Sequence, residues 1–257
     1  MRRMGIGLQL FTVRKDLAQD FTGTLRRVAE LGYEGVEFAG YGGLPAEELN
    51  DLLQQLNLKA IGAHVSLANM KADLNKEMEY LHAIGARYLV CPHIADEDRQ
   101  SPEAWQSLFD YFAEAGHQVK KKALQFAYHN HAFEFEMKVN DQFVFDAMYA
   151  SVAPEALQVE LDAGWVQYAG HDALQYIAKY AGRLPLLHLK DFKGVVNGHI
   201  NTVELGEGDI DLPAVIQAGS DAGVEWIIVE QDRCENPPLE SIAASYDWLK
   251  QNYLSKF

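Results

Sequence analysis

The chain has 257 residues, of which 48% are hydrophobic and 23% are charged, and its formal net charge is −15. This charge disfavours a nucleic-acid partner, because a protein that binds a polyanion needs clustered Lys and Arg. No apolar run approaches the roughly 20 residues of a membrane helix, and the region after Met1 lacks the long apolar stretch of a signal peptide, so we expect a cytoplasmic protein with no membrane partner.

One pattern recurs along the chain: a short run of β-branched and aromatic residues, a polar or glycine-containing loop, and a segment with apolar residues three and four positions apart. The runs indicate buried strands and the segments indicate amphipathic helices. The expected strands are Ile6–Val13, Gly35–Ala39, Lys59–Val65, Tyr88–Pro92, Leu124–His131, Leu157–Asp162, Leu186–Asp191 and Trp226–Gln231. The expected helices are Phe21–Leu31, Pro45–Leu56, Met70–Ile84, Pro102–Lys120, Gln142–Ser151, Asp172–Ala181, Leu212–Ala222 and Leu239–Tyr253.

Eight strand–helix units in alternation predict a parallel α/β fold, and their number favours a closed barrel over an open, doubly wound sheet. No G-x-G-x-x-G motif follows the first strand, so the signature of a dinucleotide-binding sheet is missing. We therefore predict an α/β protein of the (β/α)8 TIM-barrel class, in which residues 1–257 form a single domain.

Titratable residues gather at the C-terminal ends of the expected strands. These ends form the functional face of a (β/α)8 barrel, whereas the N-terminal ends contribute to stability. Five of the nine histidines fall there, namely His64, His93, His129, His131 and His188. Scattered placement would put far fewer histidines at these ends, so we expect chemistry at this face.

Strands five to eight each deliver an Asp, Glu or His, and these strands are neighbours in the expected barrel. Carboxylates this close repel one another and raise each other's pKa. A divalent cation removes that cost and accepts neutral imidazole as a further ligand. We predict one divalent metal ion (Mn²⁺, Co²⁺, Mg²⁺, Fe²⁺ or Zn²⁺) bound by His129, Asp162, His188 and Glu230, with Glu134 as the alternative to His129.

The candidate catalytic residues are Glu230, His131, Glu134 and Lys190. The first three are possible proton acceptors or donors. Lys190 lies two positions after His188, so both side chains point to the same face of the strand. Two interpretations of Lys190 stay open: it contacts a substrate oxygen, or it forms an ion pair with Glu230 or Asp162.

The candidate substrate-binding residues are Gln9, Glu37, His64, His93 and Trp165. For the first four, a structural hydrogen bond is an equally good interpretation, and an aromatic residue beside a barrel mouth is more often packing than recognition. Asp191 is expected to cap a loop or to orient a neighbouring side chain, without contacting the metal.

The chain resembles the xylose-isomerase-like sugar phosphate isomerase/epimerase superfamily, which includes ketose 3-epimerases, inosose dehydratase and endonuclease IV. The motifs that carry the resemblance span nearly the whole chain. They are Leu8-Gln9-Leu10-Phe11-Thr12-Val13-Arg14, Gly32-Tyr33-Glu34-Gly35-Val36-Glu37, Tyr128-His129-Asn130-His131, Phe133-Glu134-Phe135, Leu161-Asp162, Gly164-Trp165, His188-Leu189-Lys190-Asp191, Gly206-Glu207-Gly208-Asp209 and Val229-Glu230.

The resemblance implies one divalent metal held by acidic residues on strands five, six and eight and by a histidine on strand seven. Asp162, His188 and Glu230 match three of these positions, and His129 stands where the epimerases carry a Glu. That departure weakens the transfer of the epimerase mechanism, in which carboxylates on strands five and eight act on opposite faces of the substrate. The His-Asn-His phrase looks closer to inosose dehydratase and to lyases or hydratases of keto-sugars.

We predict a metal-dependent sugar isomerase or epimerase that acts on a keto-sugar or a polyol-derived ketone through a metal-stabilised enediolate. The alternative is a keto-sugar dehydratase or lyase like inosose dehydratase. An endonuclease-IV-like DNA repair hydrolase fits less well because the chain is acidic. A barrel that only senses a sugar or a metal is disfavoured by the crowd of titratable groups. The expected partner is a small-molecule sugar or keto-sugar, and a homo-oligomer is compatible with the sequence.

Overall fold

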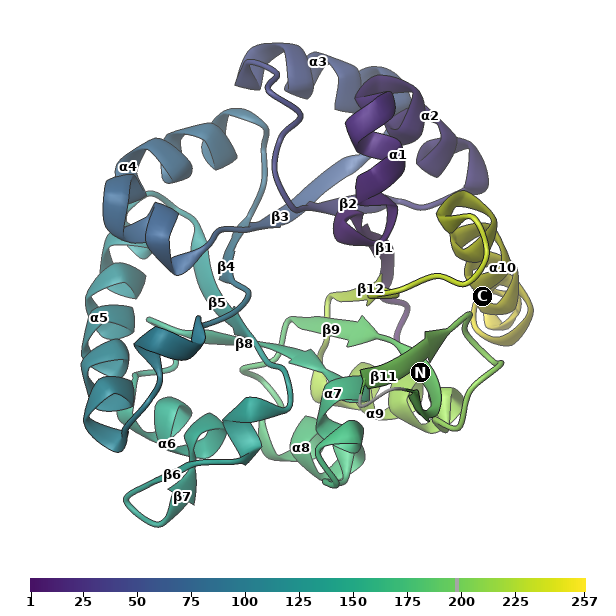
Figure 1. The fold of residues 1–257 in the computed structure, drawn as a ribbon. Coiled ribbons are helices and arrows are strands. Elements are labelled where there is room, and N and C mark those ends of the chain that lie inside the picture. The colour runs from purple at the N-terminus through teal and green to yellow at the C-terminus, as the bar shows by residue number, and fades with distance from the viewer. Residues whose placement is uncertain (197–198) are drawn as a thin grey trace.

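Eight parallel strands close into a barrel in the computed structural model, which describes residues 1–196 and 199–257 (Figure 1). Around the barrel the strands follow the order β1-β12-β9-β8-β5-β4-β3-β2. Their bounds are β1 (Gly5–Gln9), β2 (Gly35–Phe38), β3 (Lys59–His64), β4 (Tyr88–Cys91), β5 (Gln125–His129), β8 (Gln158–Asp162), β9 (Leu186–Leu189) and β12 (Trp226–Val229). The predicted (β/α)8 barrel is confirmed.

Helices form an outer ring around the strands (Figure 1). They are α1 (Arg14–Gln19), α2 (Phe21–Leu31), α3 (Ala46–Leu56), α4 (Leu67–Ala83), α5 (Pro102–Lys121), α6 (Val144–Ser151), α7 (Ala163–Tyr168), α8 (Ala173–Lys179), α9 (Leu212–Ala222) and α10 (Pro238–Asn252). Helix α5 shows why they pack: its apolar residues Trp105, Phe109 and Phe112 recur on one face and are buried. Each such side chain contributes about 1.5–3 kcal/mol on burial. None of the helices described here is both long and apolar enough to cross a bilayer.

The barrel interior is layered, with an apolar layer below a polar one. Ile61, Tyr88, Val90, Ala127, Leu186 and Ile228 form a separate buried cluster. Side chains two positions apart on a strand share a face, so His129 lies above Ala127, His188 above Leu186 and Glu230 above Ile228. The same alternation that fills the barrel with hydrocarbon therefore presents titratable groups at its C-terminal mouth.

Three expected boundaries were wrong for local reasons. Strand β1 ends at Gln9 and not at Val13, because the Gln9 side chain accepts a hydrogen bond from Phe11 N (2.9 Å) and the chain turns into a 3₁₀ helix. Helix α4 begins three residues earlier than expected, because Ser66 Oγ caps it by accepting from Asn69 N (3.1 Å). Residues expected at the start of α6 instead form the small hairpin of β6 (Lys138–Val139) and β7 (Gln142–Phe143).

An antiparallel hairpin that the sequence patterns did not predict follows β9. It consists of β10 (Asp191–Val196) and β11 (His199–Val203). Asp191 anchors the loop behind it, because its carboxylate accepts hydrogen bonds from the backbone N–H groups of Phe192, Gly206, Gly208 and Ile210 (2.9–3.2 Å). The predicted loop-capping role of Asp191 is confirmed.

Candidate metal centre

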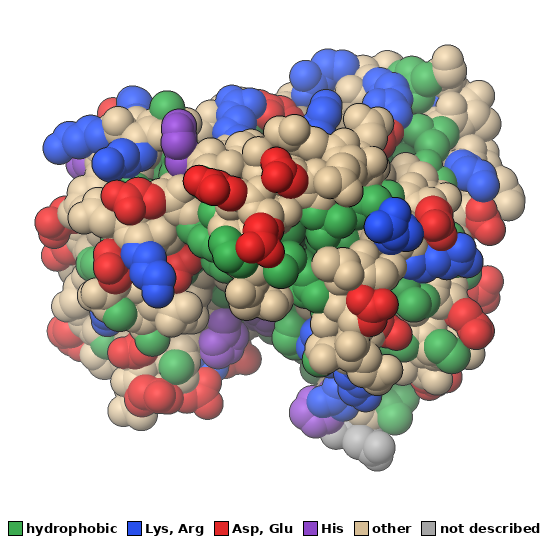
Figure 2. All heavy atoms as spheres, turned by 90° about the horizontal axis from the view of Figure 1, so that it is seen from above, with side chains coloured by type: hydrophobic (Ala, Val, Ile, Leu, Met, Phe, Trp, Pro, Cys, Tyr) green, Lys and Arg blue, Asp and Glu red, His purple; other side chains and the backbone are tan. Residues whose placement is uncertain are grey.

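Histidine and carboxylate side chains converge where the strands end. In Figure 2, which views the molecule from the side of the barrel, histidines gather in a notch at the lower edge. Two overlapping sets of side chains there bring their ligand atoms within 4.8 Å of one another. One set is His129, Asp162, His188 and Glu230, and the other is His64, His129, Glu160 and His188.

The first set is the one predicted from the sequence. The structure brings all four side chains together from four neighbouring strands, and all are buried. His188 Nδ1 lies 3.0 Å from Glu230 Oε2. Asp162 Oδ1 caps helix α7 by accepting from Trp165 N (2.8 Å), which fixes the carboxylate and leaves Oδ2 facing the cluster. We call these four residues the mouth set.

Lys190 reaches into the mouth set from the same strand end. Its ammonium Nζ lies 3.0 Å from Asp162 Oδ2, 3.2 Å from Glu230 Oε2 and 2.7 Å from Asp232 Oδ2, and the side chain is fully buried. Burial by itself lowers the pKa of an ammonium, but the three carboxylates outweigh it and hold the pKa of Lys190 well above its usual range. Of the two interpretations of Lys190, the geometry therefore supports the ion pair with Asp162 and Glu230, and it adds Asp232 as a third partner.

Glu160, which sequence reasoning missed, joins the second set. Its Oε1 lies 2.7 Å from His64 Nε2, 3.1 Å from His129 Nδ1 and 3.2 Å from His188 Nε2. Glu37 contacts the same group, because its Oε2 lies 2.8 Å from His188 Nε2 and 3.1 Å from His64 Nε2. Period-two alternation was the available signal, since Glu160 precedes Asp162 by two and must share its face.

The two carboxylates and their imidazole neighbours shift one another's pKa values. Burial alone would raise the pKa of Glu37, but His64 and His188 overcome it and hold that pKa well below its usual range. Burial lowers the pKa of His64, yet Glu37 and Glu160 raise it to about 10. His129 differs, because burial and the neighbouring His188 lower its pKa well below the usual range. A neutral imidazole is the form that binds a metal.

The residues of the mouth set fit a divalent cation. Carboxylate oxygens and imidazole nitrogens are the donors such ions take. Within residues 1–196 and 199–257, His129 Nδ1 and Asp162 Oδ2 are buried and form no hydrogen bond; each has one charged contact, Glu160 Oε1 at 3.1 Å and Lys190 Nζ at 3.0 Å. A bound cation would give both atoms a direct ligand bond. The mouth set is therefore the candidate metal centre.

An aromatic rim stands beside these donors. The His131 ring stacks on Phe133 with centroids 5.7 Å apart, lies 5.2 Å from Trp165, and is met edge-on by His93 at 5.3 Å. Burial is the main reason that the pKa of His131 falls to about 3, so the ring is neutral. His93 is exposed, and burial of part of its ring lowers its pKa. The structure thus places three predicted site residues (His93, His131 and Trp165) on this rim.

Glu134 is not part of either set. Tyr128 Oη donates to its Oε1 (2.6 Å) and His131 N donates to its Oε2 (2.9 Å), so both oxygens are engaged beneath the loop after β5. Burial raises the pKa of Glu134 to about 7. Of the two strand-five alternatives, the geometry favours His129 as the ligand.

Gln9 is engaged through both ends of its amide. Nε2 donates to Glu37 Oε2 (2.7 Å) while Oε1 accepts from Phe11 N. Its observed contacts are therefore structural, and it orients Glu37.

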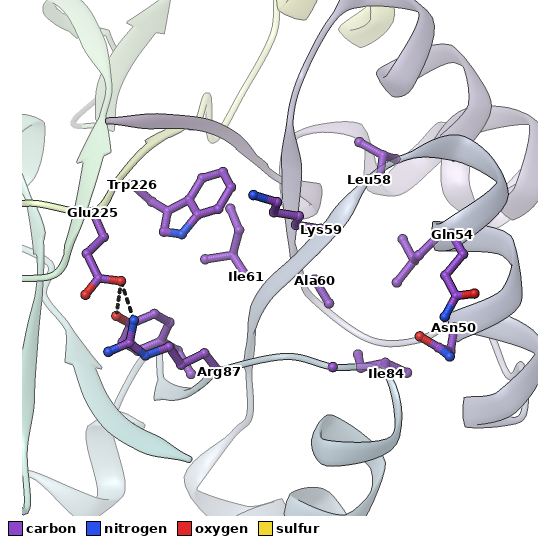
Figure 3. Close-up of a pocket in the computed structure, with 13 residues that line it drawn as sticks. Asn50, Gln54, Leu58, Lys59, Ala60, Ile61, Ile84, Arg87, Glu225 and Trp226 are labelled. Carbon is purple, nitrogen blue, oxygen red and sulfur yellow. Dashed lines mark hydrogen bonds and ion pairs between the residues drawn. The ribbon is translucent and has the colours of Figure 1, made fainter. Parts of the chain in front are cut away.

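A pocket of about 280 Å³ also lies at the opposite, N-terminal end of the barrel, where Glu225, Arg87 and Trp226 line it (Figure 3). Neither ligand set lies in that pocket.

Similar proteins cover almost the whole chain. A model of the family described as xylose isomerase-like TIM barrel matches residues 25–252. An inosose dehydratase of Geobacillus kaustophilus is 24% identical over 269 aligned residues, which cover 90% of this chain and 85% of that protein. Inosose dehydratases of Clostridium perfringens are 23% identical over 67% of this chain.

Two solved structures share the fold. A sugar phosphate isomerase/epimerase from Parabacteroides distasonis gives a TM-score of 0.80 at 24% identity and covers 97% of this chain and 98% of that one. The IOLI protein with a bound zinc atom gives a TM-score of 0.80 at 16% identity and covers 99% of both chains. At these identities the likeness establishes the architecture and not the chemistry.

Proposed function

The chain belongs to the xylose isomerase-like TIM barrel family, and on this premise we propose that it is a divalent-metal-dependent enzyme that removes a proton next to the carbonyl of a keto-sugar or a polyol-derived ketone. The family match confirms the resemblance predicted from the sequence. The observation that carries the proposal is the convergence of His129, Asp162, His188 and Glu230 at the barrel mouth.

These four residues would hold the metal ion. A divalent cation bound there would polarise the ketone oxygen and stabilise the negative charge that develops when the neighbouring C–H loses its proton. The zinc atom in the structure of the IOLI protein supports a metal in this family.

We assign proton removal to His131 on its position. Its neutral ring stands on the rim between Phe133 and Trp165, and its buried Nδ1 has no hydrogen-bond partner among the described residues. Its pKa of about 3 in the metal-free protein makes it a weak base, so the step would depend on the metal to make the neighbouring C–H acidic. Glu230 suits a ligand role better than a base role. Burial raises the pKa of Glu230, but the charge of Lys190 and the hydrogen bond from His188 outweigh burial and hold this pKa below its usual range.

Lys190 contributes a fixed positive charge beside the reacting carbon. Three carboxylates hold its ammonium in place, and the ring of Trp165 lies 5.1 Å from it. A preorganised cation stabilises a developing oxyanion without reorganising during the reaction. We therefore assign Lys190 to oxyanion stabilisation, and not to proton transfer, because its raised pKa keeps the proton on the ammonium.

Loss of water after proton removal is the outcome that the relatives favour, since similar curated proteins are inosose dehydratases. In that step the C–O bond at the carbon β to the carbonyl would break, and the hydroxide would leave as water with the proton that His131 took up. Isomerisation or epimerisation, which the sequence predicts first, begins with the same proton removal and is the second candidate. Epimerisation requires a second acid–base group on the other face of the substrate. Glu134, a candidate for that role, is turned away under Tyr128, which favours dehydration.

The test is proton exchange and product formation with the manganese-loaded protein. Inososes and keto-hexoses are incubated in D₂O, NMR follows loss of the proton next to the carbonyl, and ultraviolet absorption follows formation of an enone. We expect exchange with at least one ketone, and an enone if water is lost. Asp162→Asn and Glu230→Gln should each lower metal content and reduce exchange by about 100-fold or more.

Asp247→Asn is the matched control, because Asp247 is exposed on helix α10, away from the mouth set, and forms an ion pair with Lys250. Full metal content and undiminished exchange in both site variants would refute the proposal. Metal loss in the variants without any exchange in the wild type would instead support a metal site and reject the reaction.

A further inference from the structure

Beneath the mouth set, Glu37 meets three members of the second donor set, His64, Glu160 and His188, between strands β2, β3, β8 and β9. Glu37 Oε2, His64 Nε2, Glu160 Oε1 and His188 Nε2 form a closed ring in which oxygens and nitrogens alternate. The four successive O–N distances around this ring are 3.1, 2.7, 3.2 and 2.8 Å. We call these four side chains the deep set.

The spacing of the deep set is that of ligands around one ion. Metal–nitrogen and metal–oxygen bonds to a divalent cation are about 2.0–2.2 Å, so ligand atoms at right angles lie roughly 3 Å apart. The four distances scatter around this value.

Unpartnered oxygens point to a missing ligand here. Glu37 and Glu160 are both fully buried, and neither Glu37 Oε1 nor Glu160 Oε2 has a hydrogen-bond partner in the part of the chain that the structure describes. Burial of a carboxylate is strongly unfavourable unless it is paired or coordinates a metal. The second carboxylate oxygens would let each group bind an ion in two ways.

The charges at the mouth call for more than one divalent ion. Five carboxylates meet there (Glu37, Glu160, Asp162, Glu230 and Asp232), and Lys190 is the ammonium among them. In the empty site, protonated His64 and His188 compensate part of this charge. Metal binding displaces these protons, and at least four negative charges are then left for cations to compensate. One divalent cation in the mouth set compensates two of them, and a second in the deep set compensates two more.

We propose that Glu37, His64, Glu160 and His188 bind a second divalent cation, separate from the one assigned to the mouth set. His188 lies between the two positions, with Nδ1 facing Glu230 and Nε2 facing Glu37 and Glu160, so with both ions bound it would release its remaining ring proton and bridge them as an imidazolate. Glu37, His64 and Glu160 belong to the deep set alone, so variants at these residues report on it. The inference does not depend on the reaction proposed above.

The competing explanation is a metal-free network in which protonated His64 and His188 neutralise Glu37 and Glu160. Co²⁺ distinguishes the two, because its visible absorption reports on nitrogen and oxygen ligands and its bound amount can be counted. The protein is freed of metal with a chelator and titrated with Co²⁺, and bound metal is measured by mass spectrometry after gel filtration. Glu37→Gln and Glu160→Gln test the deep set, while Asp162→Asn and Glu230→Gln test the mouth set.

We expect two equivalents of Co²⁺ in the wild type and one in each deep-set variant, with loss of part of the visible spectrum. Glu134→Gln is the matched control for removing a buried carboxylate, and it should keep both equivalents. A wild-type stoichiometry of one that is lost in the mouth-set variants and kept in the deep-set variants would overturn the second site and leave the proposed function standing.

A stoichiometry of one with the opposite pattern would support the deep set and reject the mouth-set ligands. Absence of binding in the wild type would overturn both. Because the wild-type count and spectrum already decide between one ion and two, the proposal stays testable if a variant fails to fold.

Discussion

Replacing Lys190 by Met tests whether its ammonium and a metal ion share the same carboxylates. Methionine retains the length and the apolar stem of the side chain but carries no charge. Asp162, Glu230 and Asp232, at 3.0, 3.2 and 2.7 Å from Nζ in the wild type, then lose their shared cation. We expect a large loss of stability in the metal-free protein and a larger gain on metal addition than in the wild type.

The magnitude follows from the burial of the side chain. Lys190 is fully buried, and removing one partner of a buried ion pair destabilises a protein by about 3–5 kcal/mol. For a chain of this size each kcal/mol shifts Tm by about 2–4 °C, so the metal-free variant should melt about 10 °C lower. Mn²⁺ at 100 times its Kd stabilises by about 2.7 kcal/mol, and it should add more in the variant, where no ammonium repels it.

Differential scanning calorimetry of both proteins, with chelator and with Mn²⁺, measures the two effects. Lys179→Met is the matched control, since Lys179 pairs with Asp146 on the surface with 54% of its side chain exposed. Loss of such a pair is worth less than about 1 kcal/mol. A Mn²⁺-induced rise in Tm that is equal in Lys190→Met and wild type would refute the shared-carboxylate reasoning, whatever the loss of stability.

The pKa of Glu134 is about 7 in the folded protein, against 4.5 for an ordinary Glu. The protonated carboxyl is therefore favoured by folding, and its contribution to stability is fully present below pH 4.5 and is lost as the pH rises toward 7. The free energy of unfolding of the wild type, relative to Glu134→Gln, should therefore fall by about 3 kcal/mol across that window, and a constant difference in urea unfolding would contradict this. Gly206→Ala should cost at least about 2 kcal/mol, because Gly206 has φ +90° and a Cβ there would lie 2.3 Å from Trp248 Cδ1. Gly43→Ala, at φ +74° with no atom within 4 Å, should cost about 1 kcal/mol, and equal losses would refute the role of the clash.

The fold could be predicted because its signal is local and repeated. Each strand is an apolar run, each helix has its own apolar face, and eight repeats fit a closed barrel. The hairpin of β10 and β11 was missed although Ile200 and Thr202 alternate as buried residues in β11. Gly194, at φ +66° inside β10, interrupts the alternation of that strand, and the register shifts between Phe192 and Val195.

The site was predictable only in part, because its chemistry depends on contacts between distant strands. Selecting titratable residues at the C-terminal ends of strands identified Asp162, His188 and Glu230. It omitted Glu160, because Glu160 lies inside a strand. The role of Lys190 stayed open in the sequence, since the decision rests on Asp232, which follows the eighth strand and is 42 residues away. No local pattern could show that Glu134 would turn under Tyr128.

Anomalous diffraction from a crystal soaked in Mn²⁺ tests the central claim most directly, because it locates the ion without reference to any substrate. We expect an anomalous peak about 2.2 Å from donor atoms of Asp162, His188 and Glu230. Solvent alone between these three side chains, or a peak confined to Glu37, His64 and Glu160, would contradict a metal centre at the barrel mouth.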